Sequence, residues 1–178
     1  MTERVDVLII GAGILGCFAA RNLSRYDLKT AVIEKNEDVC TGISKANTGI
    51  IYSGYDQHPG SLKASLCVRA SKSFPELCRE LDVPYKKCGL LMPAFGPAGE
   101  KVLKKKLRQS MENNADGVSV ISGDEVHRME PALEGRITQA LYSENTCVVN
   151  PWELGIAAYE NASANGVRFY FGQEAVKI

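Results

Sequence analysis

A glycine-rich turn near the amino terminus constrains the fold of this chain more than any other feature: Gly11-Ala12-Gly13-Ile14-Leu15-Gly16. The turn follows the apolar, β-branched run 5–10, which is typical of a strand buried on both faces of a parallel sheet. Apolar residues then recur at helical spacing over 14–25, and strand character returns over 29–34. The order strand, turn, helix, strand predicts a βαβ unit of an α/β fold.

Each glycine of this turn has a physical reason. Gly11 permits the tight turn, Gly13 lets the backbone approach a pyrophosphate, and Gly16 allows close packing of the helix on the sheet. The helix amino terminus offers unpaired N–H groups to an anion. Glu34, 18 residues beyond the last glycine, can accept hydrogen bonds from a ribose 2′-hydroxyl. The pattern predicts dinucleotide binding, with a purely structural turn as the alternative, and does not distinguish NAD from FAD.

The connection over 36–60 is rich in Gly, Ser, Thr, Asn and Asp. A connection of this length inside a compact domain is usually functional. Its segment 44–54 has the small residues that let a backbone lie along a diphosphate and a flavin edge. The alternative is a flexible cluster of surface turns.

Further along the chain, apolar periodicity predicts three more helices and several strands. The helices are expected over 61–81, 100–111 and 151–164, and the strands over 83–93, 118–121, within 136–149, and over 167–171 and 174–178. Pro75 is expected to kink or divide the first of these helices. Buried stripes are expected on the first two, at Leu62, Leu66, Ala70, Phe74, Leu77 and Leu81, and at Leu103, Leu107 and Met111.

The charge balance gives no reason to expect nucleic acid or an anionic membrane as a partner. The 21 Lys and Arg cancel the 21 Asp and Glu, so no overall field recruits either. The basic cluster Lys101, Lys104, Lys105, Lys106 and Arg108 is interpreted as the solvated face of a helix, because no aromatic residues interleave with the charges. No apolar run is long enough to be a transmembrane segment.

The six cysteines, at positions 17, 40, 67, 78, 88 and 147, form no CxxC pair. The sequence therefore predicts neither a zinc site nor an iron–sulfur cluster among these residues. We interpret the cysteines as buried, reduced thiols of a cytoplasmic protein, with peripheral membrane attachment through other residues left open.

Several stretches in order resemble the FAD-dependent oxidoreductases of the D-amino acid oxidase superfamily. They are 6–16, 44–54 and 59–64, then Cys88-Gly89-Leu90-Leu91, Met129-Glu130-Pro131 and Val149-Asn150-Pro151. The branch that they resemble most holds FAD-dependent glycerol-3-phosphate dehydrogenases and L-2-hydroxyglutarate oxidases. The resemblance implies a Rossmann-like FAD-binding domain of the D-amino acid oxidase type, with the start of an inserted β-rich substrate domain.

The resemblance also implies FAD as the cofactor and a role for particular residues. The FAD pyrophosphate would be held by Gly11, Gly13, Ile14, Leu15 and Gly16, the adenosine end by Glu34 and Lys35, and the diphosphate and flavin side by Ser44, Ala46, Asn47, Thr48 and Gly49. Val176, in the final predicted strand, would make a backbone contact to adenine.

The same resemblance implies a division into domains. Residues 1–82 would be the first part of the FAD-binding domain, 83–148 a segment of the substrate domain, and 149–178 the return to the FAD-binding domain. A doubly wound dinucleotide fold needs two βαβαβ halves. We therefore expect an amino-terminal portion of a larger flavoenzyme, which by itself would turn over no substrate.

One position departs from the pattern of the hydroxy-acid branch. Tyr52 follows Asn47-Thr48-Gly49-Ile50-Ile51, where that branch commonly has histidine. Imidazole titrates near neutrality and can act as a base, whereas a phenol, with an ordinary pKa near 10, accepts a proton less readily. Tyr52 is expected either to hydrogen-bond the substrate or to be a packing residue.

The expected activity is oxidation of the CH–OH group of a small anionic substrate, with hydride transfer to flavin N5. Glycerol 3-phosphate is the first candidate substrate and a 2-hydroxy acid the second. The alternatives are an amine or amino-acid oxidase of the same superfamily, and a non-catalytic nucleotide-binding module. No residue pattern identifies the electron acceptor.

Overall fold

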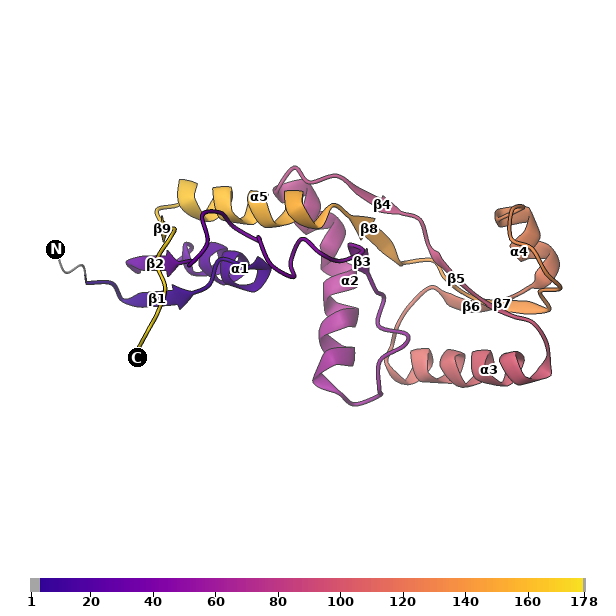
Figure 1. The fold of residues 1–178 in the computed structure, drawn as a ribbon. Coiled ribbons are helices and arrows are strands. Elements are labelled where there is room, and N and C mark those ends of the chain that lie inside the picture. Colours follow the sequence, from indigo (N-terminus) through magenta and orange to yellow (C-terminus); the bar gives the residue numbers. More distant parts are fainter. Residues whose placement is uncertain (1–3, 178) are drawn as a thin grey trace. The chain divides into compact units, whose positions relative to one another are not determined.

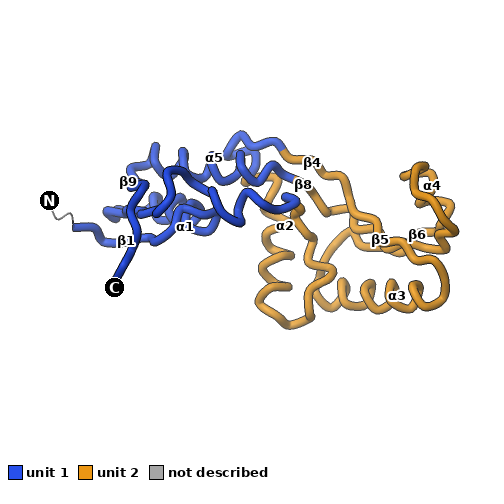
Figure 2. Tube along the Cα trace, viewed as in Figure 1, with its two compact units in different colours: residues 1–49, 78–84, 149–178 blue, residues 50–77, 85–148 orange. Residues whose placement is uncertain are grey.

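The structure, a computed structural model, describes residues 4–177. The chain divides into two compact units (Figure 2). Unit 1 comprises Met1–Gly49, Cys78–Pro84 and Val149–Ile178, and unit 2 comprises Ile50–Leu77 and Tyr85–Val148. The domain boundaries expected for the family, after residues 82 and 148, stay a prediction.

Unit 1 contains a three-stranded parallel sheet and two long helices (Figure 1). Its elements are β1 (Val7–Ile10), α1 (Ile14–Leu23), β2 (Thr30–Ile33), α5 (Pro151–Ala164) and β9 (Arg168–Tyr170). The strands lie in the order β1-β2-β9, with Val7 opposite Thr30 and Ala31 opposite Arg168. The parallel pairing of β1 with β2 around α1 confirms the predicted βαβ unit.

The main hydrophobic core of unit 1 joins α1 and α5 to the central strand β2, in which Thr30, Ala31 and Val32 are all buried. It is formed by small and β-branched residues of α1, β2, α5 and the segments beside them: Ala12, Cys17, Ala20, Val32, Val39, Cys40, Ala158, Ala162 and Val167. Ile9 packs against this core, whereas its neighbours Leu8 and Ile10 are 51% and 52% exposed. The expectation that the first strand is buried on both faces is wrong for the described residues, because β1 is an edge strand whose side chains alternate between the covered face and the open one.

Helix α5 has the predicted bounds because both of its ends carry clear signals. Asn150 is the N-cap, and its Oδ1 accepts a hydrogen bond from the Trp152 backbone N–H at 3.0 Å. Pro151 occupies the first helical position, where a missing N–H costs nothing. The helix ends before Gly166, whose φ of +90° suits glycine alone.

Unit 2 is built on antiparallel pairing. Its elements are β3 (Ile50–Ile51), most of α2 (Leu62–Glu80), β4 (Tyr85–Lys87), β5 (Leu90–Ala94), α3 (Pro97–Glu112), β6 (Val118–Ser122), α4 (Gly123–Met129), β7 (Gln139–Ser143) and the start of β8 (Cys147–Val149). One sheet has the order β3-β8-β4 and the other β5-β7-β6. Helix α3 packs on the second sheet through a core of Tyr55, Ala94, Leu103, Ala115 and Leu141.

Helix α2 differs from the sequence prediction in its buried face. It continues through Pro75 as one helix. Of the predicted stripe, Phe74 and Leu81 are buried as predicted, whereas Leu62, Leu66 and Ala70 are exposed. Ala64, which lies outside that stripe, is buried. A Cβ at Gly54 would lie 2.6 Å from Cγ2 of Val68 and 3.5 Å from the Ala64 carbonyl oxygen, so the face of α2 that carries Ala64 and Val68 packs against the turn.

Two more predictions in unit 2 need correction. The expected strand over 83–93 is two strands, because Gly89 has a φ of +70° and interrupts it. Met111 is 66% exposed rather than inward, and Ser110 is buried in its place. Ser110 lies three residues after Leu107 and stays on the face of Leu103, whereas position 111 rotates away from it.

The end of unit 1 also differs from prediction. Residues 174–177 form no strand, and residue 178 lies outside the described residues. After β9 the chain turns at Gly172, whose N–H donates to the Asn36 carbonyl at 3.0 Å, and Gln173 N–H donates to the Glu34 carbonyl at 2.9 Å. The four residues that follow therefore leave the sheet, and Val176 is 90% exposed.

Of the cysteines, 17, 40, 78 and 147 are buried as predicted, Cys67 is half-buried, and Cys88 is exposed, contrary to the prediction. All six are free thiols. None of the helices among residues 4–177 is long and apolar enough to cross a membrane.

Candidate functional site

The glycine turn of unit 1 joins β1 to α1 in a conformation that depends on its three glycines. Gly11 has a φ of +99°, and its N–H donates to the Ile33 carbonyl at 2.8 Å, which extends the parallel ladder. A Cβ at Gly16 would lie 2.0 Å from the Gly11 carbonyl oxygen, so no larger residue fits there. Gly13 is the N-cap of α1 and has no side chain to cap the helix.

The first turn of α1 offers backbone N–H groups rather than side chains. The first three N–H groups of a helix have no intrahelical partner. Ile14 N–H donates to Ser44 Oγ at 3.0 Å. Leu15 and Gly16 follow it, and the first turn has no acidic residue. This end of α1 therefore suits an anion, both through its N–H groups and through the helix dipole.

Glu34 lies beside the glycine turn, as the dinucleotide pattern predicts. Its Oε2 accepts a hydrogen bond from Ala12 N–H at 2.8 Å, and its Oε1 accepts two from Asn36, from the backbone N–H and from Nδ2, each at 2.9 Å. Burial raises the pKa of Glu34, but the hydrogen bonds from Asn36 and Ala12 outweigh it, so the pKa is lowered overall. The carboxylate is therefore ionised, and Oε2 retains acceptor capacity for a hydroxyl group.

The segment that follows β2 is tied to the glycine turn through one carbonyl. The Ala12 carbonyl accepts from Cys40 N–H at 2.9 Å and from Cys17 Sγ at 3.4 Å. A hydrogen bond with Cys40 and burial raise the pKa of the Cys17 thiol. A Cβ at Gly155 would lie 2.4 Å from Cys40 Sγ, so a glycine of α5 makes room for this segment.

Asn47 shapes the rest of this loop. Its Nδ2 donates to the Ser44 carbonyl at 2.7 Å, and its Oδ1 accepts from Gly49 N–H at 2.9 Å. Gly49 has a φ of +63°, and a Cβ there would lie 2.0 Å from the Val149 carbonyl oxygen. Ser44, Asn47 and Gly49 are therefore parts of one ordered loop, which argues against a flexible cluster of surface turns.

The structure places four of the predicted cofactor residues at exposed positions. Lys35, Ala46 and Thr48 are exposed. Val176 is exposed and lies outside the sheet. Their predicted contacts with FAD stay a prediction, as does the contact of Tyr52, a residue of unit 2, with substrate.

The structure adds residues that the sequence pattern does not reveal. A cavity of about 90 Å³ beside the loop is lined by Asp38, Val39, Cys40, Thr41, Lys45, Trp152 and Ile156. Trp152 Nε1 donates to the Lys45 carbonyl at 3.0 Å, and Lys45 Nζ lies 5.6 Å from the centre of the indole ring. Trp152 is 107 residues from Lys45, and no local pattern predicts such a pair. Asn36, which donates two hydrogen bonds to Glu34, lies only two residues after it. An amide so close in sequence to the acid is a weak indication of such a contact.

The residues at this turn fit FAD. Gly13, at the N-cap of α1, has no Cβ to keep a pyrophosphate from the backbone, and a Cβ there would also lie 3.3 Å from Ser44 Oγ. The first turn of α1 supplies N–H groups, and Glu34 supplies an ionised acceptor for a ribose hydroxyl. A 2′-phosphate would meet the negative charge of Glu34, so the arrangement favours an unphosphorylated ribose.

Comparison with known sequences agrees with this chemistry. The family model described as FAD dependent oxidoreductase (DAO) matches residues 6–178. The chain is 43% identical to the glycerol 3-phosphate dehydrogenase of Caloramator mitchellensis over 173 residues, which are 97% of this chain and 36% of that protein. It is 34% identical to the mitochondrial L-2-hydroxyglutarate dehydrogenase of Caenorhabditis elegans, over 98% of this chain and 40% of that protein.

Comparison with solved structures gives the same fold. The L-alpha-glycerophosphate oxidase of Mycoplasma pneumoniae, solved in its dithionite-reduced form with FAD bound, superposes with a TM-score of 0.91 at 27% identity, over 98% of this chain and 46% of that chain. The chain also superposes on glycine oxidase from Geobacillus kaustophilus with a TM-score of 0.87, over 97% of this chain and 48% of that one. At 23% identity, this likeness shows the shared fold alone.

The chain thus spans less than half the length of each of these relatives. The match to the family model covers almost the whole chain. The resemblance seen in the sequence, and FAD as the cofactor of the family, are confirmed. The chain belongs to the FAD dependent oxidoreductases of the D-amino acid oxidase family.

Proposed function

We propose that the protein is a dehydrogenase or oxidase that oxidises the CH–OH group of a small anionic substrate. Glycerol 3-phosphate is the first candidate substrate and a 2-hydroxy acid the second. The observation that carries the proposal is the convergence of Gly13, Ser44 and Glu34 at the amino-terminal end of α1. The order of the substrates is supported by the 43% identity to a glycerol 3-phosphate dehydrogenase and the 34% identity to an L-2-hydroxyglutarate dehydrogenase.

The chain's own residues would bind the cofactor and orient the cofactor and the substrate. The N–H groups at the start of α1 would bind the pyrophosphate, and Glu34 Oε2 would orient the adenosine ribose by accepting a hydrogen bond from a hydroxyl group. Tyr52 Oη would hold the substrate by a hydrogen bond. When bound, FAD would supply the acceptor for a hydride, which no amino-acid side chain provides.

Two alternative functions differ from this proposal in what the protein would oxidise. An amine or amino-acid oxidase has the same fold, as the likeness to glycine oxidase shows. A non-catalytic module would bind FAD and oxidise nothing. The glycerol 3-phosphate proposal stands above both because the relatives at 43% and 34% identity are dehydrogenases of hydroxyl-bearing compounds by name.

Anaerobic reduction of the bound flavin tests the proposal and separates the alternatives. The full-length protein would be purified with its flavin, and the visible flavin absorbance followed without oxygen after glycerol 3-phosphate, L-2-hydroxyglutarate or glycine is added. We expect bleaching with glycerol 3-phosphate. Bleaching by glycine alone would support the amino-acid oxidase, a stable oxidised spectrum with every compound would support the binding module, and a protein that takes up no flavin would contradict all three.

We further propose that the protein works in the cytoplasm on a small molecule and without nucleic acid as a partner. All six cysteines are free thiols, which suits a reducing compartment. The balanced charge of 21 basic and 21 acidic residues gives no attraction for a polyanion.

A further inference from the structure

The backbone around Tyr52 has little regular structure of its own. Strand β3 ends at Ile51, and residues 52–61 form no helix or strand. A side chain in such a segment keeps its place only where other parts of the protein hold the backbone. The groups that hold this segment therefore decide where the Tyr52 hydroxyl lies.

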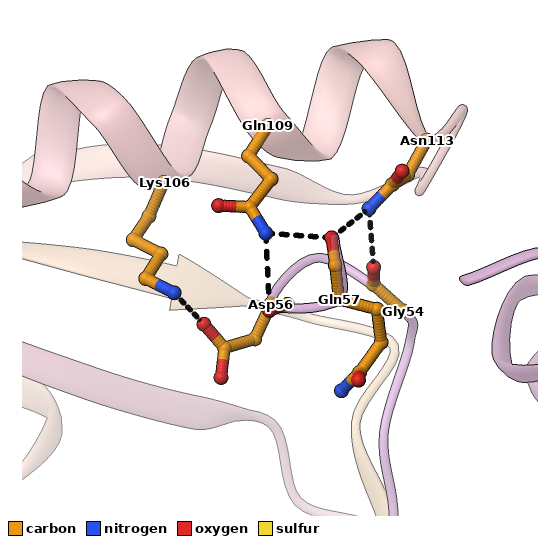
Figure 3. Close-up of polar contacts among 6 residues, drawn as sticks. All are labelled: Gly54, Asp56, Gln57, Lys106, Gln109 and Asn113. Carbon is orange, nitrogen blue, oxygen red and sulfur yellow. Dashed lines mark hydrogen bonds and ion pairs between the residues drawn. The ribbon is translucent and has the colours of Figure 1, made fainter. Parts of the chain in front are cut away.

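One face of helix α3 holds the backbone turn 54–57 (Figure 3). Gln109 Nε2 donates to the carbonyl oxygens of Asp56, at 3.1 Å, and Gln57, at 2.6 Å. Asn113 Nδ2 donates to those of Gly54, at 3.0 Å, and Gln57, at 2.7 Å. Two side-chain amides thus bind three of the four carbonyl groups of the turn, those of Gly54, Asp56 and Gln57.

An ion pair completes the contact. Lys106 Nζ pairs with the Asp56 carboxylate, and both groups are less exposed than those of the Lys72–Asp116 and Lys87–Glu144 pairs. Lys106, Gln109 and Asn113 are three and four residues apart and share one side of the helix. We call these three residues the α3 polar face.

The residues beside Tyr52 are fixed toward the interior of unit 2. Ser53 Oγ lies 2.8 Å from Ser143 Oγ, and both are buried. Tyr55 is buried in the core with Leu103 and Leu141, and burial, with the nearby charge of Asp56, raises the pKa of its hydroxyl to about 12. Tyr52 itself is 42% exposed. Ser53 and Tyr55 are therefore buried in unit 2, whereas the Tyr52 ring is exposed.

We propose that Lys106, Gln109 and Asn113 are positioning residues that fix the 54–57 turn and thereby hold the Tyr52 hydroxyl in its place toward substrate. This inference rests on the proposed function, in which Tyr52 contacts the substrate. It also explains why polar rather than apolar side chains lie on this side of α3: two amides donate to carbonyl groups of an irregular turn, and the lysine pairs with the Asp56 carboxylate. A displacement of about 1 Å at a reacting group can lower a rate by about 10²-fold.

The test is a double-mutant cycle in the full-length, flavin-loaded enzyme, with rates of anaerobic flavin reduction by glycerol 3-phosphate. Gln109→Leu keeps the size of the side chain and removes both donated hydrogen bonds. We expect Gln109→Leu and Tyr52→Phe each to lower the limiting rate by about 10-fold, and the double variant to lose little more than either single one. Hydrogen exchange at the amides of 54–57 should become faster in Gln109→Leu.

Matched variants separate positioning from a general loss of stability. Gln139→Leu makes the same substitution in β7, at a residue opposite Ala94 and Ser122, and should leave the rate unchanged. Lys106→Met should act like Gln109→Leu, though more weakly, whereas Lys105→Met, at the adjacent exposed lysine, should not. Lys106→Arg, which keeps the positive charge, should reduce its flavin at the rate of the parent enzyme. If Gln109→Leu fails to fold, the same cycle is run with Lys106→Met.

Independent effects in the cycle, whose losses multiply in the double variant, would overturn the inference. So would an unchanged reduction rate in Gln109→Leu with faster exchange at 54–57, because the turn would then be loosened without consequence for Tyr52. Failure of the proposed function is seen separately: the parent enzyme would then show no flavin reduction by glycerol 3-phosphate at all.

Discussion

The two units of this protein build their candidate sites from different materials. In unit 1 the site is made of backbone groups: the glycine turn, the N–H groups of α1, and two side chains, Ser44 and Glu34, that bond to that backbone. In unit 2 the Tyr52 segment is held by side chains that lie 50 to 59 residues away in the sequence. The first site centres on a short, contiguous glycine motif, which Glu34 and Ser44 contact from 22 and 30 residues away. The second depends entirely on contacts between distant parts of the chain.

This difference predicts that the site in unit 1 is most sensitive to substitutions that add side-chain volume at its glycines. The Tyr52 segment of unit 2 should instead be sensitive to substitutions that remove hydrogen-bond donors. The largest effect is expected for Gly16→Ala in the full-length protein. A methyl group there would lie 2.0 Å from the Gly11 carbonyl oxygen, so the turn must shift. We expect a loss of about 3 kcal/mol in the free energy of unfolding, measured with urea, and loss of bound flavin.

Gly42→Ala is the matched control for Gly16→Ala, because nothing lies within 4 Å of a Cβ at position 42. It should leave flavin binding and stability close to those of the parent. Equal stability of the two variants would show that the glycine turn does not set the geometry of unit 1.

A smaller effect is expected when a side chain of the unit 1 site is removed. Ser44→Ala leaves the Ile14 N–H without its acceptor, which lies at 3.0 Å in the parent. Loss of a helix cap of this kind costs about 1 kcal/mol. Urea unfolding should report that loss, and a fluorescence titration should show weaker FAD binding.

Ser24→Ala provides the comparison at the opposite end of α1, where the Ser24 hydroxyl donates to the Arg21 carbonyl at 2.8 Å. FAD affinity should be unchanged in this variant. If Ser24→Ala weakened FAD binding as much as Ser44→Ala, the effect would come from helix stability rather than from the site.

The smallest effect concerns the pH dependence of stability. The pKa of Glu34 is lowered from its ordinary value of 4.5 in the folded chain by hydrogen bonds from Asn36 and Ala12, which outweigh the opposing effect of burial. The ionised carboxylate therefore stabilises the fold above about pH 4.5, and this contribution is lost as the pH falls through the folded pKa. Urea unfolding of Glu34→Gln should show a weaker decline of stability below pH 4.5 than the parent. Glu37→Gln, at an exposed acid nearby, should follow the parent curve.

The sequence allowed most of unit 1 to be predicted because its signals are local. The glycine turn with its flanking strands, and α5 with Asn150 and Pro151 at its start, depend on residues that are neighbours in the chain. Glu34 could be placed beside the turn because parallel strands of a βαβ unit end at the same edge.

The predictions for α2 and α3 that are wrong concern positions where tertiary contacts decide which residues are buried. Leu62 and Leu66 outrank Ala64 in hydrophobicity, but the face of α2 that packs against Gly54 is the one that carries Ala64, so Ala64 is buried and the two leucines are exposed. Lys106 was interpreted as one of five solvated charges, and only the fold shows that it alone of them pairs with Asp56. Gln109 and Asn113 carry no sequence signal, because their partners are carbonyl groups of the main chain.

The central claim is that the backbone at the start of α1 binds the FAD pyrophosphate. Its most direct test is the FAD affinity of the Gly13→Ala variant. A Cβ at this position would lie 3.3 Å from Ser44 Oγ, a contact that small shifts can relieve. It would, however, add a methyl group at the N-cap, where we propose that the pyrophosphate approaches the backbone. In the full-length protein, we predict a thermal midpoint close to that of the parent and FAD binding that is weakened about 10-fold or more. Binding as tight as in the parent and in Gly42→Ala would contradict the claim.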